Sequence, residues 1–147
     1  MKRVITLTMA IASLLVLSQI TSCKKADPTP TTSYSIEGLW IGTYTDDQNS
    51  KSGAQYFSFV IKPDGTMIVD SKVDGQQYLA VGNWALNGSG FTASYTYVYG
   101  STSATNVGTS QSVTATWNNK EKISSGIWKN VIPSNGETGT FTMTKTN

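Results

Sequence analysis

The side chains best suited to acid–base chemistry in this chain are five aspartates between positions 46 and 74. Two carboxylates that face each other about 5–9.5 Å apart can hydrolyse a glycosidic bond. Each of these aspartates, however, lies in or beside a predicted turn, where aspartate commonly accepts hydrogen bonds from nearby backbone. We therefore interpret them as turn formers and expect no enzyme activity. A carboxylate-based glycoside hydrolase remains an alternative, recognisable by two Asp or Glu side chains converging in one pocket. The five residues are Asp46, Asp47, Asp64, Asp70 and Asp74.

Metal and nucleophile chemistry have few candidate residues. The chain has no histidine and one cysteine, Cys23. A nucleophilic triad therefore lacks its base, and zinc lacks its preferred ligands. The segment Asp46-Asp47-Gln48-Asn49 lacks the ligand spacing of a calcium loop such as the EF-hand. We expect no metal, no cofactor and no intrachain disulfide.

The charge balance argues against a nucleic-acid partner. Lys2 and Arg3 belong to a predicted leader, and without them the 11 basic residues fall to nine, which equals the number of acidic residues. Arg3 is also the only arginine. Because nucleic-acid binding depends on clustered basic side chains that neutralise phosphates, we expect no such partner.

Aromatic side chains are the remaining candidates for a binding site. Phe91, Tyr95, Tyr97 and Tyr99 alternate along one segment and so share one predicted face. Such rings stack on sugars or line an apolar cavity, while tyrosine hydroxyls orient a ligand. The alternative is that these rings, and the four tryptophans including Trp128, simply fill the core. The candidate ligand contacts are Trp40, Tyr44, Tyr78, Trp84, Tyr95, Tyr97 and Trp117.

Residues 1–22 have the organisation of an export signal and are set aside from the fold. Lys2 and Arg3 precede an apolar stretch that is a little short for a membrane span of about 20 residues. Ile20-Thr21-Ser22-Cys23 follows and resembles the lipobox of bacterial lipoproteins. The resemblance implies a cleaved signal peptide and an N-terminal Cys23 that carries acyl chains such as palmitate. The alternative is an uncleaved membrane anchor.

The residues after Cys23 bear on location and domain organisation. Lys24-Lys25-Ala26-Asp27 has no Asp directly after the cysteine and is similar to lipoproteins of the Bacteroidota. The resemblance implies a lipid anchor in the cell envelope, in the outer membrane, on its periplasmic face or at the cell surface. The Pro- and Thr-rich segment 28–33 has the composition of a spacer. We expect a signal peptide at 1–22, a lipidated Cys and tether at 23–34, and a folded domain at 35–147.

The folded domain has an all-β pattern. Alternating segments rich in Val, Ile, Thr and aromatic residues are separated by turn signals such as Pro63-Asp64-Gly65 and Asn87-Gly88. No segment has a sustained helical period. Strands are expected near residues 36–45, 55–62, 66–71, 77–86, 91–99, 111–117, 122–131 and 137–145.

Eight strands joined by short turns predict an up-and-down antiparallel meander. Pairing the first strand with the last would close it into a barrel and remove both exposed edges. A barrel of eight strands is filled by side chains or holds one small ligand. A two-sheet sandwich is the structural alternative.

A motif of glycine two residues before a large aromatic recurs four times. Such a glycine shares the aromatic side chain's face and leaves room for a ring to lie across the sheet, or allows a sharp bend. The copies are Gly38-Leu39-Trp40, Gly82-Asn83-Trp84, Gly126-Ile127-Trp128 and Gly139-Thr140-Phe141.

The first and last motifs, together with Pro63-Asp64-Gly65-Thr66, resemble the lipocalin-like (calycin-type) domains of Bacteroidota lipoproteins. In that family the tryptophan of the first strand lies at the closed end of the barrel, beneath a basic residue of the last strand. The resemblance implies these roles for Trp40 and Lys145, although the usual basic residue is arginine. Avidin-like barrels begin similarly, but Ile41-Gly42-Thr43-Tyr44 lacks their Asn and Ser, so we expect no biotin binding.

These observations predict a lipid-anchored, non-enzymatic, lipocalin-like envelope protein. It would bind a small apolar or amphiphilic ligand, or a sugar, or have a structural role. The alternative is a protein-interaction or inhibitor module, which a contiguous exposed aromatic patch would favour. The sequence does not decide its oligomeric state.

Overall fold

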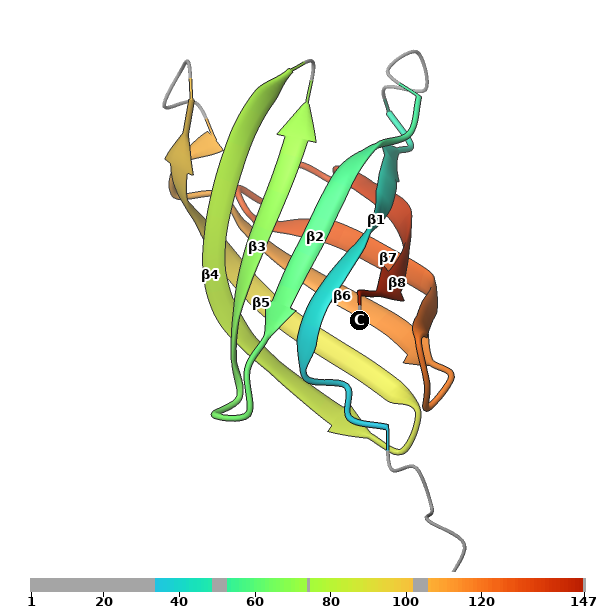
Figure 1. The fold of residues 1–147 in the computed structure, drawn as a ribbon. Coiled ribbons are helices and arrows are strands. Elements are labelled where there is room, and N and C mark those ends of the chain that lie inside the picture. Colours follow the sequence, from blue (N-terminus) through green and yellow to red (C-terminus); the bar gives the residue numbers. More distant parts are fainter. Residues whose placement is uncertain (1–33, 49–52, 74, 102–105, 147) are drawn as a thin grey trace, which may run out of the picture. The chain divides into compact units, whose positions relative to one another are not determined.

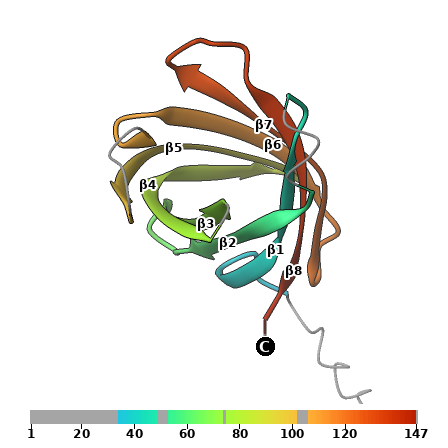
Figure 2. The same cartoon turned by 90° about the horizontal axis from the view of Figure 1, so that it is seen from above.

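The computed structural model describes residues 34–48, 53–73, 75–101 and 106–146. The expected signal peptide, Cys23, nearly all of the expected tether, and Asp74 lie outside the described residues. The described chain forms eight antiparallel strands in sequence order around a closed barrel (Figures 1 and 2). The strands are β1 Gly38–Asp46, β2 Gln55–Ile61, β3 Thr66–Val73, β4 Gln76–Asn87, β5 Gly90–Gly100, β6 Ser110–Trp117, β7 Lys122–Ile132 and β8 Thr138–Lys145.

Pairing between the first and last strands closes the barrel. β1 runs antiparallel to β8 from the pair Trp40–Lys145 to the pair Asp46–Gly139. Both edges of the meander are thereby hydrogen-bonded, which removes the templates for aggregation that open edges present. The predicted meander and its closure are confirmed, and the two-sheet sandwich is excluded. The predicted strand ends agree with the observed ones to within about two residues.

The turn between β2 and β3 has the chemistry its sequence predicts. The Asp64 carboxylate accepts hydrogen bonds from the Thr66 backbone N–H (2.9 Å) and the Thr66 hydroxyl (2.6 Å). These two bonds lower the pKa of Asp64. Gly65 has a φ of 80°, which is unfavourable for residues with a side chain. Asp64 is therefore a turn former, as expected.

The core consists of the inward-facing residues of all eight strands. Phe59 and Val69 are fully buried, and Phe141 packs edge-on against Phe57 and Phe59 with ring centroids 5.7 Å away in both cases. Burying a large apolar side chain contributes roughly 1.5–3 kcal/mol, so these clustered rings are a major part of the stabilisation. The period-2 pattern of the sequence therefore predicts the core face correctly.

Two of the glycine–aromatic motifs pair with each other. Gly126 of β7 lies opposite Phe141 of β8, and Trp128 of β7 lies opposite Gly139 of β8. A Cβ at Gly126 would lie 2.5 Å from Cε1 of Phe141, and one at Gly139 would lie 2.5 Å from Nε1 of Trp128. Each glycine thus accommodates the ring of the other motif, as the sequence analysis expected in general terms. Gly139 also allows the Thr45 carbonyl of β1 to approach closely, and a third motif glycine, Gly82, allows close approach to the backbone of β5.

Two predicted side-chain placements are wrong. Tyr99 was expected to face inward with Tyr97, but it is 49% exposed. Leu79 of β4 pairs with Tyr99 while Ala80 pairs with Tyr97, so Val98 is an extra residue that breaks the alternation. Asp70 was placed beside a turn, but β3 extends to Val73 and Asp70 lies within the strand. There it accepts a hydrogen bond from the Gln77 side chain at 3.0 Å.

One end of the barrel, which we call the closed end, is covered by the segment Tyr34–Glu37. Ile36 is buried, and its carbonyl accepts a hydrogen bond from the Trp40 indole N–H at 2.6 Å. Lys145 is the cross-strand partner of Trp40 and donates to the Ser35 carbonyl at 2.6 Å. Its side chain passes over Gly38, where a Cβ would lie 3.2 Å from Cε. Trp40 and Lys145 thus hold the N-terminal segment against the barrel.

Candidate functional site

The opposite end of the barrel, which we call the cavity end, is distinguished by polar residues at inward positions. In β6 the inward residues Val113, Ala115 and Trp117 are apolar, but the next inward position toward this end is Gln111. In β7 the corresponding residue is Asn130. Inward apolar residues would be more stabilising at these positions, because a buried polar group gains little even when it is hydrogen-bonded. The same change occurs in β1 at Asp46, in β2 at Gln55, in β3 at Ser71 and just before β8 at Glu137.

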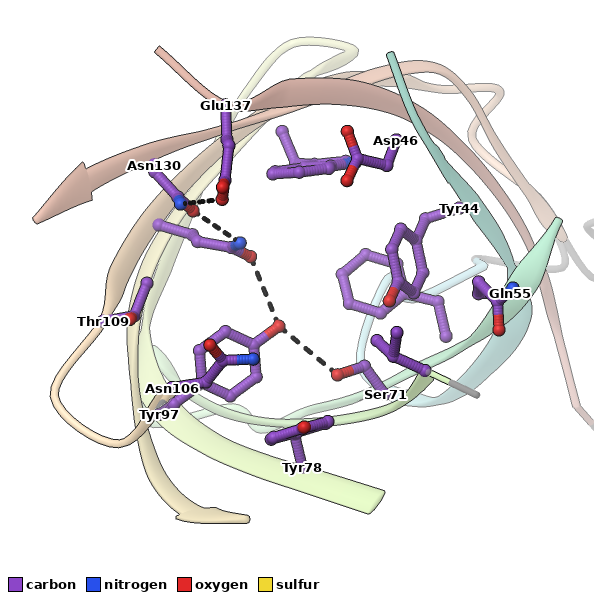
Figure 3. A pocket seen from close by; sticks show the side chains of 14 residues that line it. Tyr44, Asp46, Gln55, Ser71, Tyr78, Tyr97, Asn106, Thr109, Asn130 and Glu137 are labelled. Carbon is purple, nitrogen blue, oxygen red and sulfur yellow. Dashed lines mark hydrogen bonds between the residues drawn. The ribbon is translucent and has the colours of Figure 1, made fainter. Parts of the chain in front are cut away.

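These residues surround a cavity of about 230 Å³. Figure 3 shows their side chains converging from around the barrel wall. Five aromatic residues line it, namely Tyr44, Phe57, Tyr78, Tyr97 and Trp128. The other lining residues are Asp46, Gln55, Ser71, Val73, Asn106, Thr109, Gln111, Asn130 and Glu137. A cavity with both aromatic faces and hydrogen-bonding groups has the composition of a site for a small ligand.

A chain of hydrogen bonds crosses the cavity wall (Figure 3). The Gln111 side-chain carbonyl accepts hydrogen bonds from the hydroxyls of Tyr95 (2.8 Å) and Tyr97 (3.3 Å). The Gln111 amide donates to the Asn130 side-chain carbonyl at 2.8 Å. The Asn130 amide in turn donates to Glu137 Oε2 at 2.6 Å. This network fixes the orientation of both amides, since each uses its carbonyl on one side and its NH₂ on the other.

The two tyrosines of this network remain neutral at ordinary pH. Burial raises the pKa of Tyr97 to about 12 and raises the pKa of Tyr95 well above its usual value. The Tyr97 hydroxyl also lies 3.3 Å from the Ser71 hydroxyl. Both phenols therefore present O–H groups, not phenolate charges, at this end of the barrel.

The cavity has carboxylates on one side of its wall. Asp46 pairs with Gly139, which in turn pairs with Trp128, so these three residues form one cross-strand row. The Trp128 ring lies over Gly139 and donates its indole N–H to the Thr45 carbonyl at 2.9 Å. Glu137 precedes Gly139 by two residues, on the same inward face. The indole of Trp128 therefore lies on the wall that also carries both carboxylates.

The predicted ligand contacts divide between different parts of the barrel. Tyr44, Tyr78 and Tyr97 do line the cavity. Tyr95 is 2% exposed and lies behind the lining, where its hydroxyl supports Gln111. The three tryptophans proposed with them do not line this cavity. Trp40 is fully buried at the closed end, and Trp84 and Trp117 lie along a shallow groove beside Tyr34–Glu37.

The indole N–H groups of Trp84 and Trp117 donate hydrogen bonds to backbone carbonyls at the closed end. Trp84 donates its indole N–H to the Lys62 carbonyl at 2.8 Å, and Trp117 donates to the Lys120 carbonyl at 3.0 Å. Both acceptors belong to connections between strands, so these tryptophans anchor turns. The groove also lacks the inward polar residues of the cavity end.

Five residues of the cavity were not predicted from the sequence, namely Gln55, Ser71, Gln111, Asn130 and Glu137. Each of them, however, continues the inward alternation of its strand into a polar side chain. A polar residue at an inward position can be recognised in the sequence of a single strand. It indicates a shared site only when the pairing of all the strands is known, because the polar positions then lie at the same end of the barrel.

No three His, Cys, Asp or Glu side chains of the described chain are grouped as they would be around a metal ion. In the same residues there is no helix with the length and hydropathy of a membrane span.

Comparison with known proteins supports the fold only. No family model matches the chain, and no curated protein matches it either. Among solved structures, a redesigned β-barrel is similar, with a TM-score of 0.54 and 15% sequence identity over 76% of this chain and 91% of that one. The chain is therefore a closed eight-stranded antiparallel β-barrel with a polar, aromatic cavity at one end.

Proposed function

We propose that this protein is a lipid-anchored, lipocalin-like binding protein of the cell envelope that holds a small ligand in the cavity. The observation that carries the proposal is the set of polar inward residues, because a barrel selected for stability alone would continue its apolar core to this end. Tyr97, Gln111 and Asn130 form an oriented row of hydrogen-bonding groups. Preorganised groups of this kind lower the entropic cost of ligand binding.

The size of the cavity limits the ligand. A volume of about 230 Å³ lies below the roughly 300–1,000 Å³ of sites for drug-sized molecules. A single sugar ring, a short amphiphile or an amine fits this volume. A sterol or haem is too large to enter completely.

Intrinsic tryptophan fluorescence tests the proposal. Of the four tryptophans, Trp128 lines the cavity, whereas the other three lie at the closed end. All eight strands and the described core lie within the compact unit Ser33–Asn147. A cooperative urea transition of the segment provides the check that it is folded. We expect a saturable change in emission with one class in a panel of sugars, short amphiphiles and amines.

A matched pair of variants localises the signal. Tyr97→Phe removes a hydroxyl from the cavity wall, whereas Tyr99→Phe removes one from the outer surface of the same strand. Tyr97→Phe should weaken binding several-fold, and Tyr99→Phe should leave it unchanged. If no compound produces a saturable change, or if both variants behave alike, the cavity is not a binding site.

A carboxylate-based hydrolase is a second candidate, since Asp46 and Glu137 line the same cavity. A glycosidase needs one carboxylic acid and one carboxylate at the scissile bond. Chromogenic aryl glycosides measure this activity directly. Turnover that disappears in both Asp46→Asn and Glu137→Gln would establish the hydrolase and replace the binding proposal.

An interaction module is also compatible with one surface feature. Leu39, Val60, Ile68 and Val81 form a cross-strand row on the outside of β1–β4, and each is 36–48% exposed. The row is aliphatic, whereas the sequence analysis named an aromatic patch as the sign of an interaction module. We therefore prefer the cavity as the functional site.

A further inference from the structure

We propose that the cavity selects a positively charged ligand, a small organic ammonium compound, and disfavours carboxylates such as fatty acids. This inference rests on the proposed binding function and adds the charge of the ligand.

Among the described residues, the lining carries negative charge and no positive charge. Asp46 and Glu137 line the cavity, and none of the described residues that line it is Lys or Arg. Tyr97 adds a neutral hydroxyl because its burial opposes ionisation. An anion that enters the cavity would therefore lose hydration without gaining a cationic partner.

The geometry of the wall adds a second attraction for a cation. Asp46, Gly139 and Trp128 form one cross-strand row, and Glu137 lies two residues from Gly139 on the same face. Tyr44 lies against Trp128, with ring centroids 6.0 Å apart and planes at 86°. Aromatic faces attract ammonium groups, most strongly those of tryptophan. An ammonium group beside this wall would thus meet aromatic faces and two carboxylates together.

Within the part of the chain that the structure describes, each carboxylate accepts a hydrogen bond from a neutral donor. Asp46 Oδ1 accepts a hydrogen bond from the Gln48 backbone N–H at 2.8 Å. Glu137 Oε2 accepts one from the Asn130 amide at 2.6 Å. These bonds position the oxygens without cancelling their charge. A neutral polyol could use the same hydrogen bonds, but it would gain nothing from the two negative charges.

Three probes of equal shape and different charge test the inference. Cyclohexylmethylamine, cyclohexylmethanol and cyclohexanecarboxylate share a ring and carry positive, neutral and negative charge at pH 7. None absorbs where tryptophan does, so the emission of Trp128 reports binding directly. We expect the amine to bind at least tenfold more tightly than the alcohol, and the carboxylate more weakly than both. The attraction between one partly screened carboxylate and the ammonium group should favour the amine over the alcohol by on the order of tenfold.

Charge-neutralising variants identify the source of the preference. The double variant Asp46→Asn/Glu137→Gln keeps the size of both side chains and should bring amine affinity down to the alcohol affinity measured on the same variant. Glu121→Gln provides the matched control, because Glu121 is exposed between β6 and β7, at the closed end. It removes one negative charge, half of what the double variant removes, at a position away from the cavity, and should leave the amine preference intact. Urea midpoints for all variants show that each is folded.

Several outcomes would overturn the inference. Equal affinity for amine and alcohol, tighter binding of the carboxylate, or an amine preference that survives the double variant would each refute charge selection. A binder found only among neutral sugars in the wider panel would also refute it, while leaving the proposed binding function intact. The absence of binding across the whole panel would remove both the inference and the proposed function.

Discussion

Gly126→Ala tests the reciprocal packing of the glycine–aromatic motifs. The new Cβ would lie 2.5–2.6 Å from three ring atoms of Phe141. The ring cannot easily retreat, since it packs against Phe57 and Phe59 at centroid distances of 5.7 Å. Overpacking of this kind destabilises a protein by about 1–3 kcal/mol. Replacing Gly by Ala also lowers the conformational entropy of the unfolded chain, which stabilises the folded state by about 0.4–1 kcal/mol. We expect a net loss of about 1–2 kcal/mol in the free energy of unfolding.

Equilibrium urea denaturation measures this loss. With a slope of about 1–3 kcal/mol per molar urea, the midpoint should fall by roughly 0.3–2 M. The control is Gly90→Ala at the start of β5, where the nearest atom to a new Cβ is the Asn87 carbonyl oxygen at 3.2 Å. That variant should lose clearly less stability.

A double variant separates the ring contact from other causes. Phe141→Leu is itself destabilising because it leaves a void in the core. In that background Gly126→Ala should cost about 1–2 kcal/mol less than it does alone, since its Cβ no longer meets the ring. Additive losses, within about 0.5 kcal/mol, would show that the two residues do not interact and would refute the packing argument.

Three further predictions concern the cavity end and the leader. Burial raises the pKa of Tyr97 to about 12, so the folded protein keeps the phenol proton at pH values where the unfolded chain loses it. The free energy of unfolding should therefore decline as pH rises from about 10 to 12. Urea midpoints at pH 9 and 11 should therefore fall less in Tyr97→Phe than in the parent protein. Gln111→Leu would leave the buried Tyr95 hydroxyl without its acceptor and should lower the free energy of unfolding by about 1–3 kcal/mol, measured by urea denaturation. An unchanged midpoint would contradict that role of the amide. Cys23→Ser should move the protein from the membrane to the soluble fraction of fractionated cells, and retention in the membrane fraction would disprove anchoring by acyl chains.

Most of the fold was predictable from local patterns in the sequence. The alternation of Phe57, Phe59 and Ile61 identifies the buried face of a strand, and Pro63-Asp64-Gly65 identifies a turn. Such signals act over a few residues, so each can be interpreted without knowledge of the rest of the chain. These signals predicted the number of strands and their order. The cost of open edges favoured closure by β1 and β8, and the pairing of these two strands excluded the sandwich that the sequence had left open.

The site was predictable only in part. Tyr44, Tyr78 and Tyr97 were identified as ligand contacts and do line the cavity. Tyr99 was expected on the same face as Tyr97, but a single extra residue in β5 turns it outward. A bulge of this kind depends on pairing with the neighbouring strand, and the sequence of β5 alone does not reveal it.

The amino-acid sequence by itself determined which residues face inward in most strands and where the chain turns. Only the tertiary structure decided which inward residues meet. The pairing registers bring Gln111 beside Asn130, and Asp46 into one row with Trp128 through Gly139. The physical reason is that a strand's alternation arises from its own backbone geometry, whereas register is set by contacts between segments distant in sequence. Polar residues scattered along the chain thereby become one cavity wall.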